Sequence, residues 1–229
     1  MGTVRIVGLA EPGGRELFDR PLGHGEHPET AAYAGGFWLA EPIDALRDTT
    51  GELVVRWIAR PTDGRAAPTV PTRGQDPELD LSGVDPVLKQ RVAAYALVRS
   101  PRGLLATEFS DRTGSPGRWG LPGGGIEDLE DPASAVLRET VEETDQRILL
   151  GQLSAVQTSH WIGRSPRGVI QDFHAIRLVY RADCPDPTTP RVLDVGGTTA
   201  SARWVPIARW RRLPWTAGWR ALLPELLAG

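Results

Sequence analysis

Apolar and polar positions alternate in short runs through the first part of the chain. A Pro-Gly-Gly turn at residues 12–14 follows one such run. Residues 37–39 and 53–58 are typical of strands, because bulky and β-branched side chains gather there between turn residues. Residues 43–47 are typical of one short helical turn. The pattern predicts a small β-rich unit at residues 1–60.

The stretch at residues 61–85 has a different composition. Prolines stand at positions 61, 68, 71 and 77, with glycines between them. Proline lacks a backbone N–H and disfavours both helix interiors and central strands. We therefore expect a linker or an extended crossing of the surface.

From residue 86 onward, strand patterns alternate with helical ones. Residues 92–98 and 103–109 are joined by a turn sequence and predict a hairpin. Further elements are expected as strands at 148–157, 170–181 and 202–205, and as helices at 132–144 and 216–227. Mixed strands and helices predict an α/β layered domain over residues 86–229.

Charge and cysteine content narrow the class of protein. The 229 residues carry a formal net charge of -3, which argues against a nucleic-acid or membrane-surface binder with a basic excess. The single cysteine, Cys184, excludes an internal disulfide and a cysteine-built zinc site. No apolar run is long enough to span a membrane. We expect a cytoplasmic protein.

The predicted helix at 132–144 carries three glutamates on about one face. Glu142 and Glu143 lie three and four residues after Glu139, and Arg138 lies four before Glu142. Like charges at this spacing cost a few tenths of a kcal/mol per pair. A hard divalent cation such as Mg²⁺ removes that cost, because it prefers oxygen ligands. The glycines at 123–125 let backbone carbonyls approach a metal, or amides approach a phosphate.

Details of this helix lead to further expectations. Asp131 suits the N-cap and the proline after it suits the first helical position. The helix is expected to bury a stripe of four side chains: Ala133, Val136, Leu137 and Val141.

The spacing Gly124, Glu130, Arg138-Glu139, Glu142-Glu143 resembles the signature of the Nudix hydrolases. The flanking run from Trp119 to Glu127 is also similar to that family. The resemblance in element order covers residues 88–229. It implies an α/β/α sandwich around a mixed sheet, and it does not cover the small β-rich unit expected at residues 1–60. It also implies a pyrophosphohydrolase that cleaves a nucleoside diphosphate derivative with Mg²⁺ or Mn²⁺.

The resemblance further implies a role for each matching residue. Glu139 and Glu143 would be the principal metal ligands, with Glu142 and the carbonyl of Gly124 completing the set. Glu130 would be an auxiliary ligand or an organiser of the site, and Arg138 would orient the glutamates by salt bridge. The general base would be Glu139 or Glu142, or else an acid from a distant loop, where the nearest candidate is Asp194.

Three positions depart from the family pattern. Thr140 and Gln146 stand where aliphatic residues are usual, and we expect them to loosen the packing behind the helix. Asp145 stands where the helix usually ends in glycine. Aspartate tolerates the left-handed conformation better than most residues, so we expect the helix to end there all the same.

Candidate substrate contacts follow the strand predicted at 148–157. We expect His160, Trp161 and Arg164 in a loop, where the indole would stack on a base and the guanidinium would hold phosphate. His174 lies within a predicted strand and reads either as a satisfied core histidine or as a catalytic base. The basic, aromatic segment 203–215 reads either as a nucleic-acid contact or as the last strand and turn of the domain, and the second is favoured.

Two alternatives to the hydrolase stay open. The chain could be a non-catalytic nucleotide-sensing Nudix module of a regulatory protein, although the motif glutamates are intact. The unit at residues 1–60 could instead carry the working surface as an interaction protein, shape the cleft, or build a homodimer, because Trp38 and Trp57 would need a partner surface.

Overall fold

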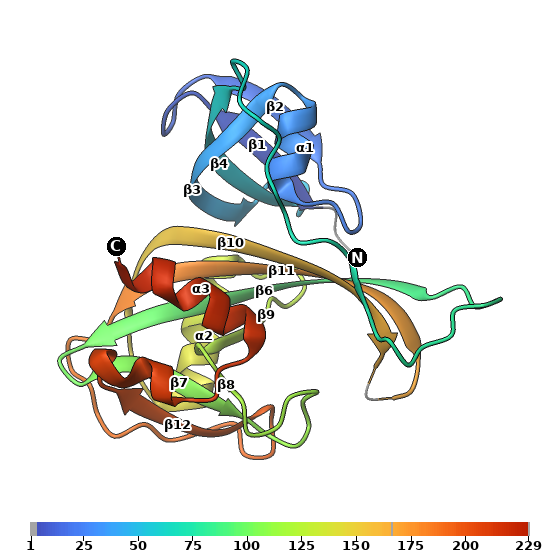
Figure 1. Cartoon of the computed structure of the whole chain (residues 1–229). Helices are drawn as coiled ribbons and strands as arrows, with labels where there is room; N and C mark the ends of the chain where they lie inside the picture. Colours follow the sequence, from blue (N-terminus) through green and yellow to red (C-terminus); the bar gives the residue numbers. More distant parts are fainter. Residues whose placement is uncertain (1–3, 166, 229) are drawn as a thin grey trace. The chain divides into compact units, whose positions relative to one another are not determined.

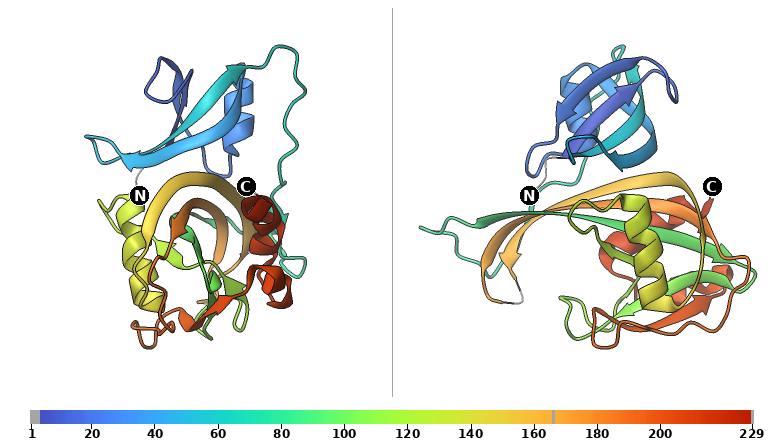
Figure 2. Two further views of the ribbon diagram at one scale, coloured as in Figure 1. Left: turned by 90° about the vertical axis from the view of Figure 1, so that its left-hand side faces the viewer. Right: turned by 180° about the vertical axis from the view of Figure 1, so that it is seen from behind.

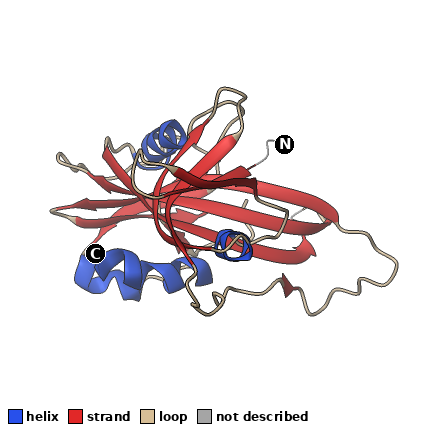
Figure 3. Cartoon of the chain, turned by 90° about the horizontal axis from the view of Figure 1, so that it is seen from above, coloured by secondary structure: helices blue, strands red, loops and turns tan. Residues whose placement is uncertain are grey.

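The computed structural model describes residues 4–165 and 167–228. Residues 1–3 of the predicted N-terminal unit, and residues 166 and 229 of the predicted second domain, lie outside the described part. The chain forms two compact units. The first contains residues 1–92 and 155–178, and the second contains 93–154 and 179–229. This division differs from the one drawn from the sequence because it groups residues 155–178 with the N-terminal part. Strands hold more residues of the chain than helices do (Figure 3).

A four-stranded sheet occupies the N-terminal part of the first unit, in the order β2-β1-β4-β3 (Figure 1). Its strands are β1 (Val4–Leu9), β2 (Glu16–Pro21), β3 (Phe37–Arg47) and β4 (Leu53–Pro61). Strand β1 runs parallel to β4, and the other pairs are antiparallel. A small core of Val7, Leu9 and Val54, with Ile43 packed against it, holds one face together. The predicted β-rich unit is confirmed.

Two local predictions in this sheet were wrong. Residues 43–47 are part of β3 and pair with β4, with register shifts that absorb the local irregularity, so there is no helical turn. Helix α1 (Pro28–Ala34) was also not predicted. Its N-cap is His27, and proline stands at its start. The imidazole of His27 accepts a hydrogen bond from the Glu29 amide, and histidine is not among the preferred capping residues.

The tryptophans of this sheet are covered within the chain. Trp57 is 7% exposed, and the guanidinium of Arg65 lies 3.8 Å from the centroid of the Trp38 ring. The ground for expecting a partner surface was therefore wrong, and the homodimer itself stays a prediction.

The proline-rich stretch after β4 has little regular structure. Between β4 and the next long strand the described chain forms only β5 (Gly74–Gln75), which pairs in parallel with Trp161 and Ile162. No helix in the described part of the chain is long and apolar enough to cross a membrane.

The larger sheet has the order β12-β7-β6-β11-β10-β5, and β8 and β9 pair with β7 and β6. Its remaining strands are β6 (Val87–Ser100), β7 (Gly103–Phe109), β8 (Trp119–Gly120), β9 (Gly123–Gly125), β10 (Leu149–Arg164), β11 (Ile170–Asp183) and β12 (Thr199–Val205). The β10–β5 pair is parallel, whereas β6–β7 and β7–β12 are antiparallel, so the sheet is mixed as expected.

Two helices cover the sheet within the second unit. Helix α2 (Pro132–Thr144) and helix α3 (Ala217–Ala228) lie on opposite sides of the strands (Figures 1 and 2). The α/β/α arrangement is therefore confirmed. Trp210 and Trp215, in and after the short 3-10 helix η1 (Ile207–Arg212), are 6% and 2% exposed. Their burial supports the structural interpretation of segment 203–215.

Candidate functional site

Helix α2 begins and ends where the sequence predicts. Asp131 holds the N-cap position with an extended backbone, and proline follows at the first helical position. At the other end Asp145 has a φ of 55°, and its N–H donates to the carbonyl of Val141 at 2.8 Å. This left-handed cap replaces the usual glycine, so the expectation that aspartate would end the helix is confirmed.

The buried face of α2 differs from the predicted one. The buried residues are Pro132, Ala135, Val136, Thr140, Glu143 and Thr144. Leu137 and Val141 are 39% and 37% exposed, and Ala133 is only half-buried, so that part of the prediction was wrong. The helix contacts β9 and β12, and the face turned toward them carries Glu143. The buried face therefore combines apolar side chains with Glu143, which accepts hydrogen bonds from β9 and β12.

Thr140 and Gln146 do not loosen the packing. Both are buried, and the Thr140 hydroxyl donates to the carbonyl of Val136 at 2.7 Å. The Gln146 amide donates to the Thr188 hydroxyl at 2.7 Å and accepts from the Thr188 amide at 2.9 Å. Satisfied polar groups are tolerated inside a protein, so the packing behind the helix is intact.

Arg138 joins three of the predicted glutamates. Its guanidinium donates to both oxygens of Glu130 at 2.9 Å, to Glu139 at 3.0 Å and to Glu142 at 3.2 Å. It also reaches the carbonyl of Gly125 at 3.3 Å. The two bonds to Glu130 form a bidentate pair with fixed geometry. Arg138 therefore forms ion pairs with three of the acidic side chains.

Glu143 is anchored in the interior. It is 6% exposed, one oxygen accepts from the Gly123 amide at 2.9 Å, and the other accepts from the hydroxyl of Thr199 on β12. Burial raises the pKa of Glu143 to about 7, against the opposing effect of these two hydrogen bonds. The negative charges of Glu139 and Glu142 add to the rise.

The glycine strand β9 lies against both helix and sheet. Gly123 has a φ of 136°, and a Cβ there would lie 2.2 Å from the carbonyl oxygen of Ala94 on β6. A Cβ on Gly124 would lie 2.6 Å from the carboxylate of Glu139. Only glycine leaves room for both approaches. The backbone at Gly124 is thus held beside a predicted metal ligand.

The donors gathered here suit a hard divalent cation. Glu130, Glu139, Glu142 and Glu143 supply carboxylate oxygens, and Arg138 is the cation that pairs with three of them. An ionised carboxylate has about four lone-pair sites, so Glu143 can accept its two hydrogen bonds and still bind a metal. Carboxylate and carbonyl oxygens are the ligands that Mg²⁺ and Mn²⁺ prefer.

The predicted substrate contacts lie in a different setting. His160, Trp161 and Arg164 are part of strand β10, so the expected loop was wrong. They belong to the first unit, whereas the glutamates belong to the second. Trp161 is 45% exposed and packs on Gly74, and Arg164 donates to the carbonyl of Gly168 at 3.3 Å. Their contact with a substrate stays a prediction.

Two other residues are placed by the structure. His174 lies in β11 and is 1% exposed, but neither ring nitrogen has a hydrogen-bond partner within the described residues, so it is not the satisfied core histidine of one expectation. Asp194 is exposed, and its amide donates to the Glu142 carbonyl at 3.1 Å. Thr199, the partner of Glu143, was missed, because nothing in its local sequence distinguishes it from other strand threonines.

The chain resembles known proteins over this region. A family model described as the NUDIX domain matches residues 89–226. A stretch of 35 residues is 57% identical to Nudix hydrolase 25 of Arabidopsis thaliana and covers 15% of this chain. That match spans 20% of the plant protein.

Solved structures with a similar chain path include two examples with low identity. A NUDIX hydrolase from Nitrosomonas europaea is 22% identical, with a TM-score of 0.48, over 62% of this chain and 90% of that one. The NUDIX domain of Shewanella oneidensis NrtR, complexed with ADP ribose, is 20% identical, with a TM-score of 0.46, over 66% of this chain and 93% of that one.

The family model covers more than half of the chain and includes every residue of the pattern between Gly124 and Gln146. The resemblance drawn from the sequence is therefore confirmed, and the chain belongs to the Nudix family of hydrolases.

Proposed function

We propose that this chain is a divalent-metal-dependent pyrophosphohydrolase that cleaves the diphosphate linkage of a nucleoside diphosphate derivative. The observation that carries the proposal is the convergence of Arg138 on three carboxylates beside the Gly124 backbone, with a fourth carboxylate buried next to them. Such a concentration of negative charge is unfavourable without a cation. Family membership supports the reaction type, and residues 86–229 would form the hydrolase domain.

The proposed metal ligands are Glu139, Glu142, Glu143 and the carbonyl of Gly124. A bound Mg²⁺ or Mn²⁺ would neutralise phosphate charge and lower the pKa of a water molecule. Anchoring by Gly123 and Thr199 fixes Glu143 and removes the entropy cost of ordering its side chain on binding. Glu139 is kept close to the backbone because Gly124 has no side chain.

Glu130 and Arg138 are proposed as positioning residues. Glu130 accepts the bidentate pair from Arg138 and also the amide hydrogen of Glu127 at 3.0 Å. It therefore ties the loop before α2 to the guanidinium that orients Glu139 and Glu142. Loss of such a supporting contact typically lowers metal affinity or activity about 10- to 100-fold.

The general base is proposed to be Glu139 or Glu142. The side chain of Glu142 is 44% exposed, compared with 19% for Glu139, so Glu142 has the freer access to a water molecule. A base must reach within hydrogen-bond distance of the proton that it removes. The exposed position of Glu142 supports it over Glu139.

The test is a panel of nucleoside diphosphate derivatives, including nucleotide sugars, dinucleoside polyphosphates and ADP-ribose, with Mg²⁺ or Mn²⁺. Released nucleotide is measured for the full chain and for Glu139→Gln and Glu143→Gln. We expect turnover in the parent and a loss of at least about 100-fold in both variants, since these ligands matter no less than their supporting residues. The exposed Glu78→Gln serves as a matched control that should keep full activity.

The same panel distinguishes the sensing module from the enzyme. Binding of a nucleotide without turnover, with either metal, would contradict the hydrolase and favour a non-catalytic role. Turnover that survives in Glu139→Gln and Glu143→Gln would contradict the proposed site.

A further inference from the structure

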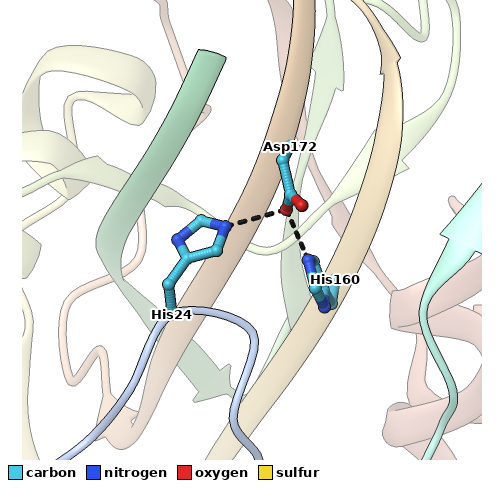
Figure 4. A group of neighbouring side chains, drawn as sticks. All are labelled: His24, His160 and Asp172. Atoms are coloured by element: carbon cyan, nitrogen blue, oxygen red, sulfur yellow. Dashed lines mark hydrogen bonds and ion pairs between the residues drawn. The ribbon is translucent and has the colours of Figure 1, made fainter. Parts of the chain in front are cut away.

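A second group of ionisable side chains lies wholly within the first unit. His24 comes from the loop between β2 and α1, His160 from β10, and Asp172 from β11 (Figure 4). The Nε2 atoms of His24 and His160 lie 2.8 and 2.5 Å from the same oxygen of Asp172. The three ligand atoms all lie within 4.8 Å of one another. Two imidazoles therefore converge on one carboxylate.

A third imidazole stands next to this group. His174 lies two residues after Asp172 on β11, so both side chains project from the same face of the strand. Its ring centroid is 5.7 Å from that of His24 and 6.1 Å from that of His160. It is 1% exposed, and both ring nitrogens lack a partner within the described residues. A buried imidazole without a partner is unusual and points to a ligand.

The ring-to-ring distances are close to those of a tetrahedral metal centre, and the His174 ring, whose nitrogens lie outside the group of atoms within 4.8 Å of one another, would turn toward the ion on binding. With metal–nitrogen bonds of about 2.0 Å, two imidazole centroids on one zinc ion lie roughly 5 Å apart. The three centroid distances here are 5.4, 5.7 and 6.1 Å. The ligand atoms of such a centre lie about 3.3 Å apart, so the contacts of His24 and His160 to Asp172 need to open by less than about 1 Å.

The backbone near His24 is shaped to fit this group. Gly25 has a φ of 72°, and a Cβ there would lie 2.3 Å from the His160 ring. Glycine at position 25 therefore lets the loop approach His160 more closely than a residue with a side chain would. The second oxygen of Asp172 faces the guanidinium of Arg73 at 3.9 Å, which leaves the first oxygen for the histidines.

We propose that His24, His160, His174 and Asp172 bind a zinc ion. Three imidazole nitrogens and one carboxylate oxygen form a donor set that suits Zn²⁺ and related transition metals, whereas Mg²⁺ prefers oxygen. A hydrogen-bonded His–Asp–His group alone leaves His174 without a partner. The metal would fasten the loop after β2 to strands β10 and β11, which makes it a structural site.

The test measures zinc in the full chain after chelation, reconstitution and gel filtration, with excess Mg²⁺ present to occupy the oxygen ligands of α2. We expect one zinc per chain in the parent, and a loss of at least tenfold in zinc affinity for His24→Ala, His160→Ala and His174→Ala. The matched control is His27→Asn, which changes a histidine in the same loop and keeps a capping side chain for α1. It should retain zinc, as should Glu139→Gln.

Cobalt provides a readout that needs no variant. Co²⁺ bound to the chelated parent should show the intense visible absorption of four-coordinate cobalt, and Zn²⁺ should abolish it. Octahedral cobalt spectra, or zinc content equal in the parent, His24→Ala and His174→Ala, would overturn the proposal. Zinc that is lost with Glu139→Gln and kept in the histidine variants would assign the metal to α2 instead.

Discussion

The acidic group on α2 and the histidine group of the first unit bring ionisable side chains together in different ways. On α2 the carboxylates are pulled together by Arg138, and Glu143 is fixed by the Gly123 amide and Thr199. In the other group His24 and His160 share the carboxylate of Asp172, and the ring nitrogens of His174 have no hydrogen-bond partner in the described structure. The first is an excess of carboxylate oxygen, and the second is an excess of imidazole nitrogen.

This difference suggests that one chain can bind two different cations, each selectively at its own site. Mg²⁺ is hard and keeps water and phosphate oxygens in its shell, so it can be exchanged with substrate. A zinc ion held by four protein ligands has no open position and contributes to folding. The comparison predicts that variants on α2 change catalysis and the pH dependence of stability, whereas variants in the histidine group change metal content and metal-dependent stability.

The largest effect expected is on the pH dependence of stability in chelated protein. Burial raises the pKa of Glu143 from 4.5 to about 7. Between these values the unfolded chain has lost the proton that the folded chain keeps, so the free energy of unfolding falls as pH rises from about 4.5 to about 7. The shift corresponds to on the order of 3 kcal/mol. Urea unfolding at a series of pH values should show this loss in the parent and not in Glu143→Gln.

The informative quantity is the difference between the two pH curves. Burial lowers the pKa of His174 to about 4, and its titration acts in the opposite direction, because stability is lost as pH falls. That contribution is common to both proteins and cancels. Glu78→Gln, at an exposed position in the first unit, should follow the parent. A flat difference curve would show that Glu143 is not strained, and the contrast between the two groups would fail on the acidic side.

The second prediction changes the backbone beside Glu139. Gly124→Ala places a Cβ 2.6 Å from the Glu139 carboxylate, which is the mobile end of a flexible side chain. The carboxylate can move away at little cost in stability, but a displacement of about 1 Å at a catalytic group can lower the rate about 100-fold. We expect kcat/KM on the substrate found by the panel to fall about 100-fold, with the free energy of unfolding changed by less than about 1 kcal/mol.

Gly114→Ala is the matched control, because a Cβ there meets nothing within 4 Å. Zinc content should be unchanged in both variants. Full activity in Gly124→Ala would mean that the position of Glu139 beside the glycine strand is not needed for catalysis.

The sequence could predict the acidic group because its geometry is local. Glu139, Glu142 and Glu143 are placed by the period of one helix, and Asp131 and Asp145 mark its two ends. The burial of Glu143 was not predicted, since its partner Thr199 lies 56 residues farther along the chain. A polar contact of this kind leaves no periodic pattern.

The histidine group has no local signature at all. His24 and Asp172 are 148 residues apart, and only the fold makes them neighbours. His160 was expected in a loop after the strand predicted at 148–157, but pairing with β5 and β11 extends the strand to Arg164. Helix α1 was missed for a related reason, since seven residues are too few for a helical period to be recognised.

The smallest effect expected concerns the loop that carries His24. Gly25→Ala combines a left-handed backbone with a clash against the His160 ring, whereas Gly13→Ala has nearly the same φ, 69° against 72°, and meets nothing within 4 Å. Left-handed strain costs each variant about 1 kcal/mol of stability. Only Gly25→Ala should also push the loop away from His160, and we expect it alone to lose zinc.

Unfolding curves and zinc content, measured with and without chelator, separate the strain of the backbone from the loss of the metal. If the structural zinc proposal is correct, chelation will reduce the stability of Gly13→Ala more than that of Gly25→Ala, because only the former still holds the metal. Equal zinc content in the two variants would show that the close approach of the loop to His160 does not serve metal binding.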